Sequence, residues 1–194
     1  MIVLASASPT RKKLLENAGL NFVVEVSTLD EAVEKPSLQH LAPRDQAIRL
    51  AELKAQSVSK HRPSDLVIGS DQILEFNHQT TDKPMSYQNA FVQLSALQGN
   101  THHLHSAAVC VIAGQTTFTS CQTVELKMRE MTAENINQYL QAAGPQALAC
   151  VGCYQIEGLG IQLFEAIKGD YFSILGLPLL PLLVHLRNSG HSVL

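Results

Sequence analysis

The chain has 194 residues, of which 45% are hydrophobic and 16% charged, so it can bury one sizeable core, and we expect a single domain over residues 1–194. Fourteen lysines and arginines against seventeen aspartates and glutamates give a formal net charge of −3, which argues against a protein that coats nucleic acids. The longest apolar run, residues 174–184, is broken by one glycine and two prolines, whereas a membrane span needs about twenty uninterrupted apolar residues. We therefore expect neither a nucleic-acid polymer nor a membrane as partner.

Met1 leads directly into apolar residues 2–5, with no basic leader of the secretory kind. Four irregularly spaced cysteines are too few for the disulfide framework of a small secreted domain. We expect a cytoplasmic protein with reduced thiols.

The first half of the chain alternates apolar runs with amphipathic segments. Four segments have the patterns of strands or helices: 2–5 (strand), 9–18 (helix capped by Ser8), 22–26 (strand) and 43–59 (helix of period 3.6). Residues 28–37 are predicted as a polar loop. A buried strand over 66–69 is expected to deliver Ser70, Asp71 and Gln72 at its carboxyl end, where open α/β sheets place ligand-binding groups.

The second half continues the alternation. Its predicted elements are a helix over 86–97, a hairpin of strands over 101–113 and 116–128, a helix over 132–142, an irregular stretch over 150–160, a strand over 161–167 and a helix over 178–188. Strands and helices thus alternate along the whole chain. The pattern predicts a mixed α/β fold, in which any division into lobes comes from the long hairpin and its helix.

Hydroxyl and basic side chains gather at the start of the first predicted helix. Ser8 caps this helix, and Arg11, Lys12 and Lys13 place three cations in its first turn. Free N–H groups and the positive end of the helix dipole attract anions, so cations there are unfavourable unless an anion binds. The segment is a candidate phosphate site, with a solvated basic helix face as the alternative.

Carboxylates suited to phosphoanhydride hydrolysis occur at Asp30, Glu31 and Asp71. That reaction needs a divalent ion held by oxygen ligands and a group that takes a proton from water. Asp71, after a buried strand, suits the proton acceptor. The alternatives are a turn residue for Asp71 and surface loop residues for the other two.

Lys54 falls on the apolar stripe of the helix predicted over 43–59. An ammonium there is costly unless it reaches water by snorkelling or meets an anion, and both interpretations stay open. Lys83 precedes a proline in a predicted loop, and this pattern alone is explained by an ordinary charged loop residue.

Three further motifs fall short of a site. Residues 150–153 form a single C-x-x-C without a second ligand pair, so small residues in a tight loop are a better interpretation than zinc. His103 and His105 share a strand face without a third ligand and are interpreted as structural. Residues 158–160 lack the rest of a dinucleotide fingerprint, and no P-loop motif occurs.

Eight motifs that span nearly the whole chain resemble, in order, those of the Maf family. They are Leu4–Arg11 (LASASPTR), Asp30-Glu31, Ala51–Ala55 (AELKA), Gly69–Gln72 (GSDQ), Lys83-Pro84, Gly152–Gly158 (GCYQIEG), Gly169–Phe172 (GDYF) and Gly176–Leu179 (GLPL). The resemblance implies a nucleoside triphosphate pyrophosphatase, a house-cleaning hydrolase of nucleotide metabolism. It also implies a fold related to inosine triphosphatases, in which an elongated central mixed sheet with flanking helices is split by a cleft between two lobes.

The resemblance also implies a mechanism and roles for single residues. Water attacks the α-phosphorus of a nucleoside triphosphate, Asp71 accepts its proton, and Glu31 with Asp71 helps to hold a divalent cation, Mg²⁺ or Mn²⁺. Phosphate contacts are implied for Ser8, Arg11, Lys54 and Lys83. We group Lys83 with Asp71 and Glu31 as the catalytic residues. A homodimer is a possible assembly.

Three residues are candidates for the choice of base: Thr10, Gln72 and Glu157. The sequence Ser70-Asp71-Gln72 followed by Glu157 is more similar to the branch of the family that acts on 7-methyl-GTP than to the branch that acts on dTTP and UTP. The former branch usually has a tryptophan where this chain has Thr10, and the chain contains no tryptophan to stack on a methylated base. We expect a slight preference for guanine-type or modified purine nucleotides, with dTTP and UTP left open.

A nucleotide-binding regulator of septum formation with little turnover is the rival hypothesis. Asp71 separates the two, because a protein that only binds nucleotides needs no proton acceptor beside the phosphates.

Overall fold

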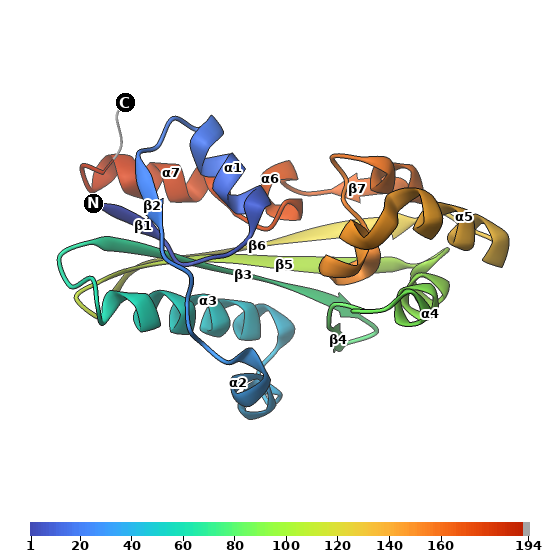
Figure 1. The fold of residues 1–194 in the computed structure, drawn as a ribbon, viewed down its shortest axis with the longest axis horizontal. Coiled ribbons are helices and arrows are strands. Elements are labelled where there is room, and N and C mark those ends of the chain that lie inside the picture. Colours follow the sequence, from blue (N-terminus) through green and yellow to red (C-terminus); the bar gives the residue numbers. More distant parts are fainter. Residues whose placement is uncertain (192–194) are drawn as a thin grey trace. The chain divides into compact units, whose positions relative to one another are not determined.

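The computed structural model describes residues 1–191. Within them, seven strands form one sheet in the order β2-β1-β3-β5-β6-β7, with β4 paired to β3 (Figure 1). The strands are β1 (Ile2–Leu4), β2 (Phe22–Val24), β3 (Leu66–Phe76), β4 (Gln79–Thr81), β5 (Thr101–Ile112), β6 (Gln115–Met128) and β7 (Phe164–Lys168). The α-helices are α1 (Pro9–Asn17), α2 (Glu31–Leu38), α3 (Pro43–Ser59), α4 (Tyr87–Leu97), α5 (Ala133–Ala143), α6 (Tyr171–Ile174) and α7 (Leu179–Asn188).

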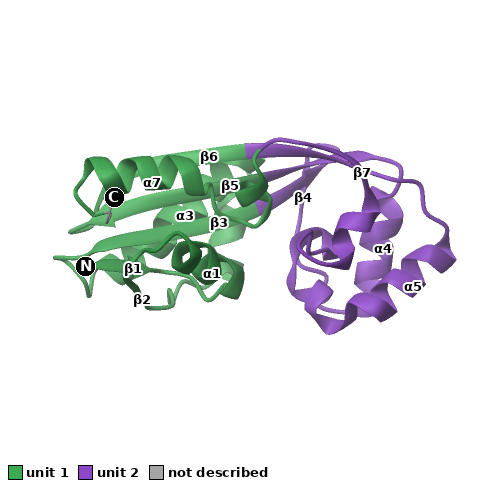
Figure 2. Ribbon diagram, turned by 90° about the horizontal axis from the view of Figure 1, so that it is seen from above, with its two compact units in different colours: residues 1–72, 105–122, 170–194 green, residues 73–104, 123–169 purple. Residues whose placement is uncertain are grey.

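The chain folds as two compact units (Figure 2). Unit 1 consists of residues 1–72, 105–122 and 170–194, and unit 2 of residues 73–104 and 123–169. Strands β3, β5 and β6 continue from one unit into the other. Neither unit is therefore a single continuous stretch of chain.

Unit 1 is built on parallel strands. β1 pairs in parallel with β2, Ile2 opposite Phe22, and with β3, Ile2 opposite Leu66. Helices α1 and α7 cover one face of these strands and α3 covers the other (Figure 1). Leu15 of α1 and Leu182 of α7 are fully buried in one core with β1 and β3. This core fixes the start of α1 beside the carboxyl end of β1.

Unit 2 combines antiparallel pairs with helices. β3 pairs with β4, Leu74 opposite Thr81, and β6 pairs with β7, Leu126 opposite Ile167. Three short 3₁₀ helices lie between α5 and β7: Gly144–Ala149, Val151–Cys153 and Leu159–Leu163. The buried His102 and Tyr154 pack with Phe164 in an aromatic cluster.

Most predicted elements are confirmed, and the mixed α/β class with them. The helix predicted over 43–59 has these bounds in the structure, and Ser8, Ser86 and Thr132 each cap a helix through the side-chain oxygen. The predicted strand over 161–167 begins only at Phe164, because residues 159–163 form a 3₁₀ helix. Strand β4 and helix α6 were not predicted.

The prediction of a polar loop over residues 28–37 is wrong, because α2 begins at Glu31. Asp30 caps this helix, its Oδ1 accepting a hydrogen bond from the N–H of Ala32 at 3.0 Å. Glu31 in the first turn and Lys35 in the last complement the helix dipole and form an i,i+4 ion pair at 3.4 Å. These local interactions sustain a helix in spite of Pro36.

The predicted end of the third strand at residue 69 is also wrong. β3 continues to Phe76 and turns through Asn77 and His78, both with positive φ, into β4. This two-residue turn is typical of a tight hairpin. Asp71 therefore lies inside a strand and not at its carboxyl end.

Candidate active site

Asp71 and Lys54 meet because helix α3 packs closely on strand β3. Gly69 lies two residues before Asp71, on the same face of the strand. A Cβ added at Gly69 would lie only 2.0 Å from the carbonyl oxygen of Ala51, so a side chain there would push α3 away. With glycine, Lys54 of α3 brings its Nζ to 2.5 Å from Asp71 Oδ1.

The Lys54 ammonium bridges two carboxylates. Its Nζ also lies 2.7 Å from Glu31 Oε1, and only 13% of the Lys54 side chain is exposed. The other oxygen of Glu31, Oε2, lies 3.4 Å from Lys35 Nζ. Of the two interpretations of Lys54, the structure thus supports an ammonium that meets anions.

Burial and ion pairing act in opposite directions on these carboxylates. Burial raises the pKa of Asp71 above its usual value, although Lys54 and Arg11 favour the charged form. Burial also acts to raise the pKa of Glu31, but Lys54 and Lys35 outweigh it and lower this pKa. Asp71 accordingly binds a proton more readily than an ordinary aspartate, and Glu31 less readily than an ordinary glutamate.

Arg11 is held at the start of α1 by contacts with three segments. Ser8 Oγ accepts the Arg11 backbone N–H at 3.3 Å. The guanidinium donates from Nε to the carbonyl of Gly176 at 2.8 Å, and from Nη1 to the carbonyl of Ser70 at 2.9 Å and to Ser6 Oγ at 3.3 Å. Burial lowers the pKa of Arg11, an effect opposed by Asp71 and Glu31. The group is thus a fixed cation close to the carboxylates.

Gln72 faces away from Asp71, since neighbouring strand residues point to opposite faces of the sheet. Its Nε2 donates to Ser106 Oγ at 2.9 Å and to the carbonyls of Ser173 and Ile174 at 3.0 Å each. Thr10 lies half-buried in the first turn of α1. The predicted part of these residues in base choice stays a prediction.

Lys83 and Glu157 belong to unit 2, whereas the residues above belong to unit 1. Both side chains are exposed, and the charges of both change the pKa of the Cys150 thiol. Burial raises the pKa of this thiol; Glu157 raises it further and Lys83 lowers it. The predicted roles of Lys83 and Glu157 in catalysis and base choice stay predictions.

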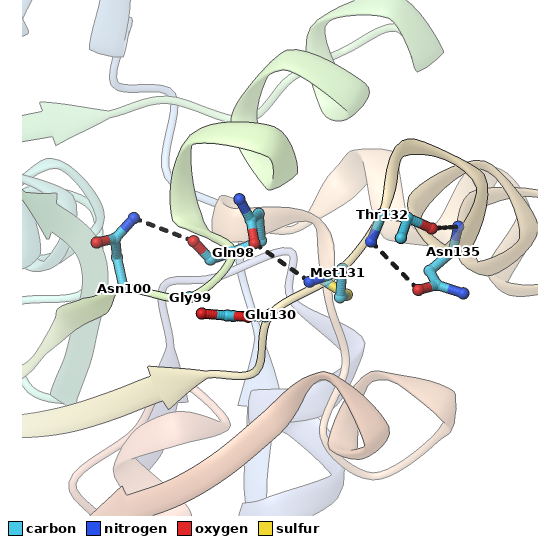
Figure 3. A pocket seen from close by; sticks show the side chains of 7 residues that line it. All are labelled: Gln98, Gly99, Asn100, Glu130, Met131, Thr132 and Asn135. Carbon is cyan, nitrogen blue, oxygen red and sulfur yellow. Dashed lines mark hydrogen bonds between the residues drawn. The ribbon is translucent and has the colours of Figure 1, made fainter.

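A polar pocket of about 600 Å³ opens in unit 2 (Figure 3). It is lined by Gln98, Gly99, Asn100, Glu130, Met131, Thr132 and Asn135. These groups largely bond one another: Gln98 Oε1 accepts the Met131 N–H, and Thr132 and Asn135 form the capping box of α5. None of the predicted site residues lines it.

The oxygen ligands of the site suit a divalent cation. Among residues 1–191 no three or more histidine, cysteine or acidic side chains gather as a ligand group. The carboxylates of Glu31 and Asp71, however, both contact the Lys54 ammonium and so lie close together. Mg²⁺ is commonly held by one or two carboxylates, with substrate phosphates and water as its other ligands. This pair of carboxylates fits that mode of binding.

Sequence reasoning missed the buried residues that support Arg11. Ser6, Ser70 and the carbonyl of Gly176 are its hydrogen-bond partners. The motif GDYF and the motif GLPL, which begins at Gly176, were matched to the family without a role. Their presence was the available signal.

Comparison with known proteins places this chain in a family. The chain belongs to the Maf-like proteins, whose match covers residues 1–189, so the predicted resemblance is confirmed. Among residues 1–191 no helix has the length and apolar character of a membrane span.

Three relatives are similar over almost their whole length. The chain is 44% identical over 191 residues to the 7-methyl-GTP pyrophosphatase of Rhizobium johnstonii and 47% identical over 191 residues to that of Mesorhizobium japonicum, with 97% of this chain and 96% of each relative covered. It is 43% identical over 187 residues to the nucleoside triphosphate pyrophosphatase of Bradyrhizobium diazoefficiens, with 96% of this chain and 93% of the relative covered.

A solved structure, the nucleoside-triphosphatase / dITP/XTP pyrophosphatase of Mycobacterium abscessus, gives a TM-score of 0.44 at 14% sequence identity. The comparison covers 97% of this chain and 93% of that chain.

Proposed function

We propose that this chain is a nucleoside triphosphate pyrophosphatase that converts a nucleoside triphosphate to a monophosphate and pyrophosphate. The observation that carries the proposal is the buried Asp71 carboxylate, ion-paired to Lys54 beside Glu31 and close to the fixed Arg11. Family membership and the names of the relatives support the same reaction.

Asp71 is the proposed proton acceptor. A carboxylate whose pKa is raised by burial binds a proton more readily than an exposed one, yet the neighbouring cations favour its ionised form before reaction. It can therefore take the proton of a water molecule as that water attacks the α-phosphorus. The oxygen of the bond to pyrophosphate then leaves with its electron pair.

The cations of unit 1 are proposed to bind the phosphates. The start of α1 carries no acidic residue in its first turn, so its dipole and Arg11 both favour an anion. Lys54 is proposed to exchange part of its contact with Asp71 for a phosphate oxygen. Ser8 supports this arrangement as the cap of α1, and the family resemblance adds Lys83 as a further phosphate ligand.

Glu31 and Asp71 are proposed to hold a divalent cation, Mg²⁺ or Mn²⁺, together with the phosphates. Such an ion, when bound, neutralises charge on the phosphate oxygens. Lys35 and Lys54 keep the pKa of Glu31 low, so Glu31 stays ionised and available as an oxygen ligand at neutral pH.

For the base, we rank 7-methyl-GTP and other guanine-type nucleotides ahead of dTTP and UTP. The relatives named 7-methyl-GTP pyrophosphatase support this order, and the acidic Glu157 can accept hydrogen bonds from a guanine edge. We further expect the enzyme to act in the cytoplasm, with a homodimer as a possible assembly.

The experiment is product analysis across a panel of triphosphates. Purified protein with Mg²⁺ or Mn²⁺ is incubated with 7-methyl-GTP, GTP, ATP, UTP and dTTP, and the products are separated by ion-exchange chromatography. Monophosphate with pyrophosphate supports the proposal, and diphosphate with orthophosphate contradicts attack at the α-phosphorus. Tight nucleotide binding without any product would favour the regulator hypothesis.

A further inference from the structure

A hydrogen-bond network in unit 1 joins β3 to helix α6, on the face of the strand opposite Asp71. Gln72 shares the two N–H groups of its amide among Ser106 Oγ and the carbonyls of Ser173 and Ile174. Ser106 Oγ in turn donates to the Ser173 carbonyl at 2.6 Å. Both serines are fully buried. Gln72 thus bonds two carbonyls at the end of α6, and that of Ser173 also accepts the backbone N–H of Gly176 at 3.0 Å.

The same network reaches the nucleotide site through Gly176. Ser70, two residues before Gln72 on the same face of β3, donates its Oγ to the Gly176 carbonyl at 2.9 Å. That carbonyl also accepts Arg11 Nε at 2.8 Å. The Gly176 carbonyl, together with the Ser70 carbonyl and Ser6 Oγ, therefore fixes the Arg11 guanidinium.

The approach of Gly176 to Arg11 is unusually close. Gly176 has a φ of +93°, a conformation that side chains disfavour, and a Cβ there would lie 3.3 Å from Arg11 Nε. The backbone that contacts Arg11 is thus held in a conformation that glycine adopts readily and other residues rarely. Gln72 and Ser70 supply the hydrogen bonds that anchor it to β3.

We propose that Gln72 is a positioning residue of the nucleotide site, which acts through the backbone of Ser173–Gly176 to orient the Arg11 guanidinium toward the phosphates. This replaces the predicted contact of Gln72 with the base by a role behind Arg11. The proposal rests on the proposed function in one respect, since it takes Arg11 as a phosphate ligand.

A double-mutant cycle tests this role without turnover. The dissociation constant Kd of a non-hydrolysable α,β-methylene triphosphate is measured for wild type, Gln72→Leu, Arg11→Lys and the double variant, at a temperature where each is folded. Gln72→Leu should raise Kd about tenfold, since small displacements of a positioned group have large effects. In the Arg11→Lys background it should change Kd less than twofold, because the group it positions is gone.

Gln46→Leu is the matched control. Gln46 also lies in unit 1 and donates its Nε2 to one backbone carbonyl, that of Leu41, at 2.9 Å. It should lower the melting temperature without moving Kd. Ser70→Ala is the milder second variant in case Gln72→Leu does not fold, and its effect on Kd should likewise vanish in the Arg11→Lys background.

The NMR signal of the Arg11 Nε–H, assigned by its loss in Arg11→Lys, gives a readout besides affinity. Its exchange with water should be slow in wild type and at least tenfold faster in Gln72→Leu or Ser70→Ala. Equal rises of Kd in both backgrounds, or an unchanged Nε–H exchange rate, would overturn the proposal. A rise of Kd for purine analogues but not for pyrimidine analogues would also overturn it, because Gln72 would then act on the base. A wild type that binds the analogue but releases no pyrophosphate would instead reject only the proposed function.

Discussion

At the scale of single residues, Asp71 combines burial with two neighbouring cations. We expect Asp71→Asn to keep the fold and the affinity for a triphosphate analogue but to lower kcat by about 10²-fold or more, the usual contribution of positioned acid or base catalysis. The kcat of wild type should fall on acidification through a pKa above the usual aspartate value, because burial raises the pKa of Asp71. Steady-state kinetics from pH 4 to 8 measure both effects.

Asp45→Asn is the matched control for that prediction, since Asp45 is an exposed carboxylate at the start of α3. It should leave kcat and its pH dependence unchanged. Near-normal turnover by folded Asp71→Asn protein would remove Asp71 from the role of proton acceptor.

The burial of His102 predicts that the stability of the protein depends on pH. It is fully buried beside Tyr154, with its Nδ1 unbonded, and burial lowers its pKa to about 4. Between about pH 4 and pH 6.5 this imidazole binds a proton in the unfolded chain, where its pKa is near 6.5, but stays neutral in the folded protein. The free energy of unfolding should therefore fall as the pH drops from about 6.5 to about 4, by about 3 kcal/mol in all.

Urea denaturation at several pH values checks this dependence. His102→Gln keeps a polar partner for Tyr154 but cannot titrate, so its stability should vary less over the same range. His40→Gln, at an exposed position, should retain the wild-type slope. An equal slope in wild type and His102→Gln would assign the effect to other groups.

Glu157 tests the choice of base. Replacing it by glutamine exchanges an acceptor oxygen for a donor at nearly constant size, and an unpaired polar group at a base carries its full desolvation cost. We predict that Glu157→Gln lowers the ratio of kcat/KM for 7-methyl-GTP to that for UTP roughly tenfold. A uniform fall on all substrates would place Glu157 with the phosphates or the metal instead.

At the scale of elements, the contact between α3 and β3 sets the distance between Lys54 and Asp71. Gly69→Ala would place a methyl group 2.0 Å from the Ala51 carbonyl and 2.9 Å from the Ala55 Cβ. Backbone cannot give way as a flexible side chain can, so we expect a loss of about 3 kcal/mol in the free energy of unfolding. The shift of α3 should also lower kcat/KM, because Lys54 moves with the helix.

Gly158→Ala is the stability control for that variant, since a Cβ there meets its nearest atom at 3.8 Å. Thermal unfolding of both variants, with kcat/KM measured well below each midpoint, separates loss of stability from loss of geometry. Wild-type stability in Gly69→Ala would mean that α3 does not depend on the absence of that Cβ.

The elements that the sequence predicted well are those whose signals are local. The Ser8, Ser86 and Thr132 caps and the apolar stripe of α3 act over a few residues, and each proved correct. The extension of β3 to Phe76 depends on pairing with β4, which a short apolar run does not reveal. Helix α2 had its cap and charges in the sequence but no regular apolar stripe.

The same distinction applies to the site. Lys54 was conspicuous because a cation on an apolar stripe needs an anion, and Asp71 because it follows a buried run. Their contact at 2.5 Å, however, depends on packing at Gly69. The Gly176 carbonyl that fixes Arg11 is a backbone group, whose position no residue type encodes.

At the scale of the whole molecule, the continuity of three strands links the two units. β3 passes from unit 1 to unit 2 after Gln72, while β5 and β6 cross at residues 104–105 and 122–123. A unit that unfolded alone would have to release its part of each strand and leave the remaining part with unpaired backbone groups. Strand continuity therefore favours unfolding of the entire chain in one step.

We predict a single two-state transition, so that proton uptake by His102 in unit 2 also destabilises the proposed nucleotide site in unit 1. The chain lacks tryptophan, so Phe118→Trp reports on unit 1 and Phe91→Trp, in α4, on unit 2. Both positions are half-buried. In urea at pH 7 the two fluorescence transitions should coincide with each other and with circular dichroism at 222 nm, after each variant is normalised to its own stability by the dichroism signal.

At pH 4.5, where His102 opposes folding, the transitions of both variants should shift to lower urea concentrations by the same amount. If the Phe91→Trp transition came before the loss of dichroism and the Phe118→Trp transition did not, unit 2 would unfold by itself. The shared strands would then not couple the unfolding of the two units.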